Sequence, residues 1–128
     1  MYPADLKYSK EHEWVKVEGA RGRIGLTHHA QTALGDVVFV ELPKVGRVVK
    51  QMEAFGVVES VKAVSDVYSP VGGAVVEVNT ALETAPELVN KDCYGAGWIV
   101  VVELANAKEL DALMDVKAYE AFLASEGH

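Results

Sequence analysis

The chain has 128 residues, half of them hydrophobic, with a formal net charge of −7 and a pI near 5.0. This length and composition predict a single domain over residues 1–128 that can bury a core without a disulfide or a metal ion. The acidic charge argues against nucleic acid or an anionic membrane as a partner, because phosphate contacts need clustered lysine and arginine side chains.

Cysteine content and the start of the chain indicate a compartment. Cys93 stands alone and cannot form an internal disulfide, which suits a reducing environment, and we expect an inert, half-buried thiol. Residues 1–5 lack the character of a signal or transit peptide, and no apolar run approaches the ~20 residues of a membrane span. The sequence therefore predicts a cytoplasmic protein without a membrane span.

The first predicted element is a β-hairpin. Residues 8–17 alternate between polar and apolar side chains towards their end, and residues 23–26 form the returning strand. Gly19 and Gly22 mark the turn between them.

A short helix and a strand come next. Thr27 is an N-cap for a helix over residues 28–34, and Gly35 ends this helix in a left-handed conformation. The predicted inner face of the helix comprises Ala30, Ala33 and Leu34. A strand over residues 36–42 follows and is closed by Pro43.

Two similar segments flank the middle of the chain. Residues 46–50 and 73–77 align, and the same offset pairs Phe55 with Leu82. The alignment predicts two similar half-sheets related by an approximate two-fold axis. A chance match in a valine-rich chain remains open as the alternative.

Between these segments, residues 55–70 predict a second hairpin with Lys62 at or near its tip. Apolar residues dominate both ends, as buried strands require. The turn type stays open because neither Asn-Gly nor Asp-Gly is present. A single lysine on a turn is in itself more often an ordinary surface residue.

The last third predicts a loop, a central strand and two helices. Residues 81–89 contain a proline and form the loop, with room for a short turn around Glu87 and Leu88. Residues 98–104 are apolar on both faces, which indicates a central strand. The core sheet then covers about residues 8–104. Apolar residues at helical spacing predict two short helices over about residues 107–124, with a break at Asp115 and Val116.

No constellation for catalysis or metal binding is visible. The histidines, His12, His28, His29 and His128, lack metal-ligand spacing, and neighbours on a helix point about 100° apart. A Schiff-base enzyme would need a desolvated lysine, whereas a hairpin tip exposes Lys62. We therefore predict a non-catalytic protein.

An exposed lysine on a rigid hairpin suits acylation by another enzyme. The modified side chain becomes an arm whose far end reaches partner sites at an effective concentration of order mM. Glu59 and Asp66 flank Lys62 and are candidate recognition residues for the modifying enzyme, although ordinary solvated acids remain the alternative.

The segment Glu59-Ser60-Val61-Lys62-Ala63 resembles the lipoylation segment of the glycine cleavage system H proteins. Further motifs of that family occur in order along nearly the full chain. They lie at residues 12–15, 25–27, 30–31, 34–43, 65–66, 69–70, 77–79, 86–90, 94–95 and 97–98.

The resemblance implies a mainly β fold, a barrel-sandwich hybrid of the biotinyl/lipoyl type, with short C-terminal helices. It also implies lipoate on Lys62, attached by a lipoate-protein ligase or octanoyltransferase. The arm would take the aminomethyl group of glycine from the pyridoxal-phosphate decarboxylase (P protein). It would pass that group to tetrahydrofolate at the aminomethyltransferase (T protein), and dihydrolipoamide dehydrogenase (L protein) would reoxidise it. We expect a monomer.

In the family the loaded arm can fold into a cleft on the carrier. On matching positions, the resemblance places Glu13, Asp66 and Tyr94 around the arm, whereas a surface acid on an edge strand is the alternative for Glu13. The chain departs from the family at Cys93, where members often have proline, and at Ala33, which is polar in some members.

Two other carriers and one enzyme class remain as alternatives. An H-like protein that relays lipoate to other acceptors would need the same hairpin. A biotin carrier would centre its lysine between methionines, whereas Val61 and Ala63 flank Lys62. A Schiff-base enzyme would trap a carbonyl substrate on unmodified Lys62.

Overall fold

The computed structural model describes residues 2–126, so His128 lies outside the described residues. The strands are β1 (Lys7–Tyr8), β2 (Glu13–Glu18), β3 (Arg21–Leu26), β4 (Val37–Glu41), β5 (Val48–Val49), β6 (Ala54–Ser60), β7 (Val64–Tyr68), β8 (Gly73–Val78) and β9 (Val100–Leu104). The helices are α1 (His28–Leu34), α2 (Ala81–Thr84), α3 (Leu88–Lys91), the 3-10 helix η1 (Ala107–Ala112) and α4 (Val116–Glu126). The fold is mainly β with a few short helices, which confirms the predicted class.

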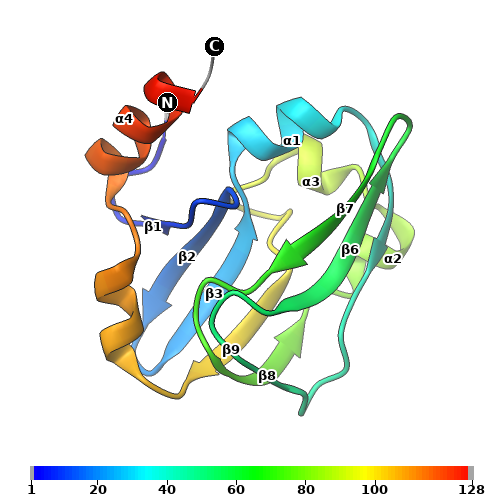
Figure 1. Cartoon of the computed structure of the whole chain (residues 1–128). Coiled ribbons are helices and arrows are strands. Elements are labelled where there is room, and N and C mark those ends of the chain that lie inside the picture. The colour runs from blue at the N-terminus through cyan, green and yellow to red at the C-terminus, as the bar shows by residue number, and fades with distance from the viewer. Residues whose placement is uncertain (1, 127–128) are drawn as a thin grey trace.

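The strands form two antiparallel sheets that enclose the main core (Figure 1). One sheet has the order β1-β2-β3-β9-β8-β5, and the other has the order β4-β6-β7. Val15 and Val100 of the first sheet and Val58 of the second are fully buried in this core. The apolar segment after residue 97 is central, as predicted, although β9 begins at Val100.

The two similar segments lie side by side but do not build similar half-sheets. Val48 of β5 pairs with Ala74 of β8 in antiparallel register. Beyond this pair the likeness ends, because Phe55 lies in a strand and Leu82 in a helix. In addition, the first hairpin and β1 extend one sheet only, so the sheets contain six and three strands.

The returning strand of the first hairpin begins at Arg21, two residues earlier than predicted, so the turn includes Gly19 but not Gly22. Gly19 has a φ of +64°, and Gly22 lies within β3 opposite Val17. A different constraint acts at Gly25, where a Cβ would lie 2.6 Å from the Trp14 ring. The absence of a side chain at Gly25 therefore allows the buried Trp14 indole to pack directly on β3.

Helix α1 begins and ends as predicted. The Thr27 hydroxyl accepts a hydrogen bond from the Ala30 amide, which caps the first turn. Gly35 has φ +78° and ψ −156°, a region that is essentially restricted to glycine but differs from the predicted left-handed helical conformation. Leu34 is buried, whereas Ala33 is exposed rather than part of the inner face.

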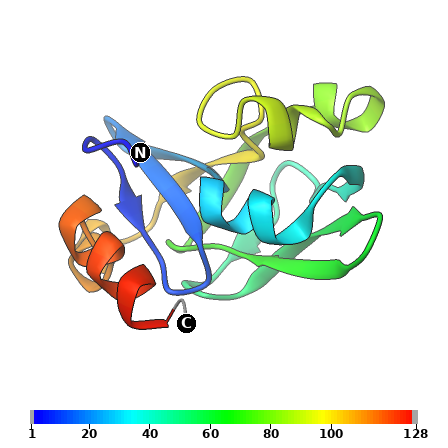
Figure 2. The same ribbon diagram turned by 90° about the horizontal axis from the view of Figure 1, so that it is seen from above.

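The predicted loop over residues 81–89 was wrong at its start, which forms α2, whereas α3 begins where the sequence left room for a short turn. Helices of four residues show no periodicity in a sequence, and these two are held by the buried side chains of Leu82 and Val89. Figure 2 shows α1 between the β6–β7 hairpin and the α2–α3 segment.

The C-terminal helices differ from the prediction in their boundary. Val116 begins α4 instead of breaking the helix, because the Asp115 carboxylate accepts from the Ala118 amide and caps it. Tyr119 of α4 stacks on Tyr8 at 4.6 Å in a second aromatic cluster. Among residues 2–126, no helix combines the length and apolarity needed to cross a membrane.

Candidate functional site

Lys62 lies at the tip of the β6–β7 hairpin and is exposed. The Ser60 amide donates to the Ala63 carbonyl at 2.8 Å, and the Ser60 hydroxyl accepts from the Ala63 amide at 3.1 Å. The Val61 amide donates to the Asp36 carbonyl at 3.0 Å, which ties the tip to the start of β4. The structure thus presents an accessible amine on a well-held turn.

A groove of about 460 Å³ begins beside this tip. Its lining includes Ala63 and Asp66 of the hairpin, Ala30 and Ala33 of α1, and Leu26 and Glu13 of the first hairpin. Apolar side chains therefore form much of the walls, and an acidic side chain lies at the end contributed by β2. The exposure of Ala33 is explained by this groove, since the residue lines it instead of the core.

Glu13 lines the groove, yet its exposed fraction is only 1%, which is uncommon for an ionisable side chain. One carboxylate oxygen accepts from the Ser9 hydroxyl and the other from the Tyr68 amide at 3.2 Å. Burial raises the pKa of Glu13 to about 7, and these hydrogen bonds oppose the shift. Glu13 is therefore a buried carboxyl whose pKa lies near neutral pH. The alternative prediction, an acid on the surface of an edge strand, was wrong, because β2 lies between β1 and β3.

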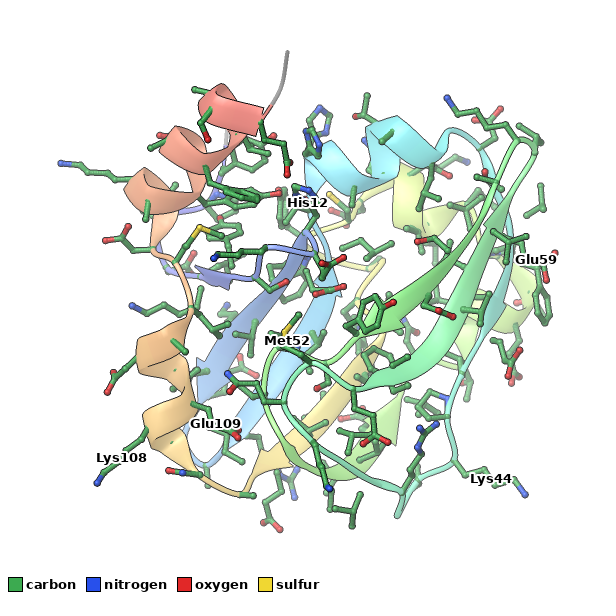
Figure 3. The ribbon with its side chains drawn as sticks, viewed as in Figure 1. His12, Lys44, Met52, Glu59, Lys108 and Glu109 are labelled. Carbon is green, nitrogen blue, oxygen red and sulfur yellow. The ribbon has the colours of Figure 1, made fainter. Side chains whose placement is uncertain are left out.

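The two predicted recognition acids share one face of the hairpin. Glu59 pairs with Val64 and Asp66 with Val57, so the acids occupy diagonal cross-strand positions. Asp66 is exposed on the edge strand β7 and lines the groove. Glu59 lies on the middle strand β6 and points away from the body of the molecule (Figure 3).

Tyr94 is not brought together with Glu13 and Asp66, because it does not line their groove. Its hydroxyl accepts a hydrogen bond from the His28 amide at 2.8 Å, at the first residue of α1. Tyr94 therefore helps to position a helix that forms one wall of the groove.

Cys93 is buried, more deeply than the sequence predicted, and lies close to the same region. Burial raises the pKa of its thiol to about 11, so the reactive thiolate is scarce at neutral pH. The Cys93 carbonyl accepts from the Trp14 indole at 3.0 Å. The residue fits an inert structural role.

Comparison with known proteins gives a consistent answer. The family described as "Glycine cleavage H-protein" matches residues 6–126. The chain belongs to the glycine cleavage H-protein family. It is 67% identical over 120 residues to a glycine cleavage system H protein of Symbiobacterium thermophilum, covering 94% of each chain. It is 57% identical over 118 residues to one of Bacillus subtilis, covering 92% of this chain and 93% of the relative.

A solved structure of the glycine cleavage H-protein family agrees with the fold. The crystal structure of a glycine cleavage system H protein from Mycobacterium marinum superimposes with a TM-score of 0.84 at 39% identity. The likeness covers 98% of this chain and 99% of that one. Two sheets enclosing a core, together with this neighbour, are consistent with the predicted barrel-sandwich hybrid.

Two groove residues of this H-protein family member, His12 and His29, were not predicted to lie there, and neither was the hydrogen bond from Ser9 to Glu13. The four-residue spacing between Ser9 and Glu13 was a weak signal for their hydrogen bond. No local signal connects His12 to His29, which approach only through folding, with ring centroids 4.5 Å apart. Burial and the neighbouring His29 lower the pKa of His12 below its ordinary value.

Proposed function

We propose that this chain is the lipoyl carrier protein of the glycine cleavage system, with lipoate attached to Lys62. The observation that carries the proposal is a groove whose lining includes both Ala63, the neighbour of the exposed Lys62, and the buried Glu13. An attachment point and a docking place for the same arm thus lie on one molecule.

The residues present fit a lipoyl arm. Lys62 offers a solvent-exposed amine to a modifying enzyme. Leu26, Ala30 and Ala33 give the groove apolar surface for a hydrocarbon chain, and the buried Glu13 carboxyl offers a polar end for an amine.

Lys62 would hold the lipoyl group, which would supply a redox-active disulfide as carrier of the aminomethyl group between the P and T proteins and as substrate of the L protein. This chain's residues orient and shelter that arm. Helix α1 and the hairpin form walls of the groove, and the Glu13 carboxylate accepts hydrogen bonds from an amine within it. Tethering raises the effective concentration at each partner to the order of mM.

The proposal also covers how the chain is modified and where it works. A lipoate-protein ligase or octanoyltransferase acylates Lys62, with Glu59 and Asp66 as recognition residues on the same face of the hairpin. The chain is a non-catalytic, monomeric carrier in the cytoplasm.

The first test is an intact mass before and after treatment with a lipoate ligase, lipoate and ATP, followed by peptide mapping. A gain of one lipoyl group on Lys62 is expected. The modified protein is then mixed with P, T and L proteins, and transfer of the glycine methylene carbon to tetrahydrofolate is measured.

The outcomes separate the proposal from its alternatives. Modification without support of glycine cleavage, but with transfer of lipoate to other acceptors, would identify a relay protein. Modification by a biotin ligase instead would identify a biotin carrier. No modification of the folded chain would overturn the assignment of Lys62.

A further inference from the structure

Two imidazoles and one carboxylate converge beside the groove from three separate parts of the chain. His12 precedes β2, His29 lies in the first turn of α1, and Glu126 is the last residue of α4. One ligand atom from each lies within 4.8 Å of the other two, and His12 Nε2 lies 3.1 Å from Glu126 Oε1. Figure 3 shows His12 between α1 and α4. We propose that these three residues bind one Zn²⁺ ion.

The backbone holds His12 in place before any metal arrives. The His12 amide donates to the Ser9 carbonyl at 3.1 Å, and the His12 carbonyl accepts from the Thr27 amide at 3.1 Å. His12 has a φ of +71°, an uncommon conformation for a residue other than glycine. Because Thr27 caps α1, the second hydrogen bond fixes His12 relative to the helix that carries His29.

The outer contacts of His12 resemble those of a zinc-ligating histidine. Its Nδ1 lies 2.8 Å from the Tyr119 hydroxyl, which in turn lies 2.8 Å from the Thr27 hydroxyl. Tyr119 and Thr27 are fully buried, so this series of hydrogen bonds is shielded from water. With Nδ1 as the donor, the Nε2 lone pair is directed to the side of Glu126. A hydrogen bond at the second nitrogen is what orients metal-bound imidazoles.

The donor set selects the kind of ion. Two imidazole nitrogens and one carboxylate oxygen are ligands of zinc sites with an open fourth position, whereas Ca²⁺ and Mg²⁺ prefer oxygen alone. Tetrahedral zinc with bonds of about 2.0–2.1 Å separates neighbouring ligand atoms by about 3.3 Å. The 3.1 Å contact is already close to this value, and the remaining pairs of ligand atoms lie within 4.8 Å.

The proposed ion would lie at the edge of the groove, because His12 and His29 also line it. It would tie the end of α4 to α1 through metal–ligand bonds, in addition to the aromatic contacts of Tyr119. The proposal does not depend on lipoylation of Lys62. The sequence places His28 and His29 side by side, but only the fold brings Glu126 and His12 to His29.

The test is calorimetric titration of Zn²⁺ into the full, unmodified chain, compared with the variants His29→Asn and Glu126→Gln. His28→Asn is the matched control, because His28 is the exposed neighbour of His29 and its ring contacts Gln31 instead. Glu126 is exposed at the end of α4, so its substitution leaves the core intact. Co²⁺ serves as a second probe, since its visible absorption reports tetrahedral coordination.

We expect one equivalent of Zn²⁺ to bind, with affinity reduced more than about 10-fold in His29→Asn and in Glu126→Gln and retained in His28→Asn. Tetrahedral Co²⁺ absorption should follow the same pattern. Absence of saturable binding would overturn the proposal. So would binding that survives both ligand substitutions, or binding that His28→Asn weakens to the same extent.

Discussion

The two ends of the groove are built in opposite ways. At one end Lys62 is exposed, and backbone and Ser60 hydrogen bonds hold its turn. At the other end Glu13 is buried, and Ser9 and Tyr68 fix both of its carboxylate oxygens. Under the proposed function, the exposed end suits attachment of the arm by another enzyme, and the buried end suits docking of that arm.

The difference predicts how each end responds to substitution. Exposed positions usually tolerate change within about 0.5 kcal/mol, whereas buried polar groups carry large costs when their partners or charge change. Substitutions at the Lys62 end should therefore alter modification more than stability. Substitutions at the Glu13 end should alter stability and its pH dependence.

The largest expected effect is at the exposed end. Lys62→Arg should abolish lipoylation and glycine cleavage completely, because a guanidinium is not acylated by the ligase. The free energy of unfolding should change by less than about 0.5 kcal/mol, since the side chain is exposed. Mass spectrometry and urea unfolding measure the two quantities. Lipoylation of this variant, or a large loss of stability, would contradict the comparison.

Glu13→Gln tests the buried end through pH. The pKa of Glu13 is about 7 in the folded chain against an ordinary 4.5, so the folded state binds the proton more tightly. The wild type should therefore lose stability relative to the variant as pH rises between these values, by up to about 3 kcal/mol, and no further above them. Urea unfolding near pH 5 and pH 8, with a chelator present, measures the difference.

A difference between wild type and Glu13→Gln that is the same at both pH values would contradict the raised pKa. The variant should also lose its aminomethyl load faster once lipoylated, because the amine loses its anionic partner. An unaltered decay rate would count against contact between Glu13 and the arm.

Gly35→Ala tests whether the packing of the Lys62 side chain against Gly35 affects lipoylation. The positive φ of Gly35 should cost the variant about 1–3 kcal/mol of folding free energy. Its Cβ would also lie 3.3 Å from Cε of Lys62 and displace that side chain. Gly19→Ala is the control, because Gly19 has a φ of +64° but nothing within 4 Å of the added Cβ. Both variants should be less stable, and only Gly35→Ala should change the lipoylation rate. Equal rates would show that the stem contact is unimportant.

The smallest effect is expected at Glu59. Glu59→Gln should slow lipoylation a few-fold if the ligase reads this acid, with stability unchanged. Glu77→Gln, an exposed acid on β8, is the control. Equal initial rates of lipoylation for the two variants and the wild type would remove Glu59 from the recognition surface.

Much of the site at the Lys62 end was predictable from the sequence. The hairpin, its tip and the helix from His28 to Leu34 depend on alternation, turn residues and a cap within a few residues. The four-residue helices α2 and α3 were missed, because tertiary contacts of Leu82 and Val89 stabilise them rather than local periodicity.

The sequence by itself determined the mainly β class, the second hairpin and the exposure of Lys62, because these follow from patterns between neighbours in the chain. Only the tertiary structure decided that Glu13 is buried, that Tyr94 supports α1 instead of lining the groove, and that His12 meets Glu126. Burial and long-range approach depend on how the sheets and helices pack. A local pattern carries no information about which distant side chain completes a site.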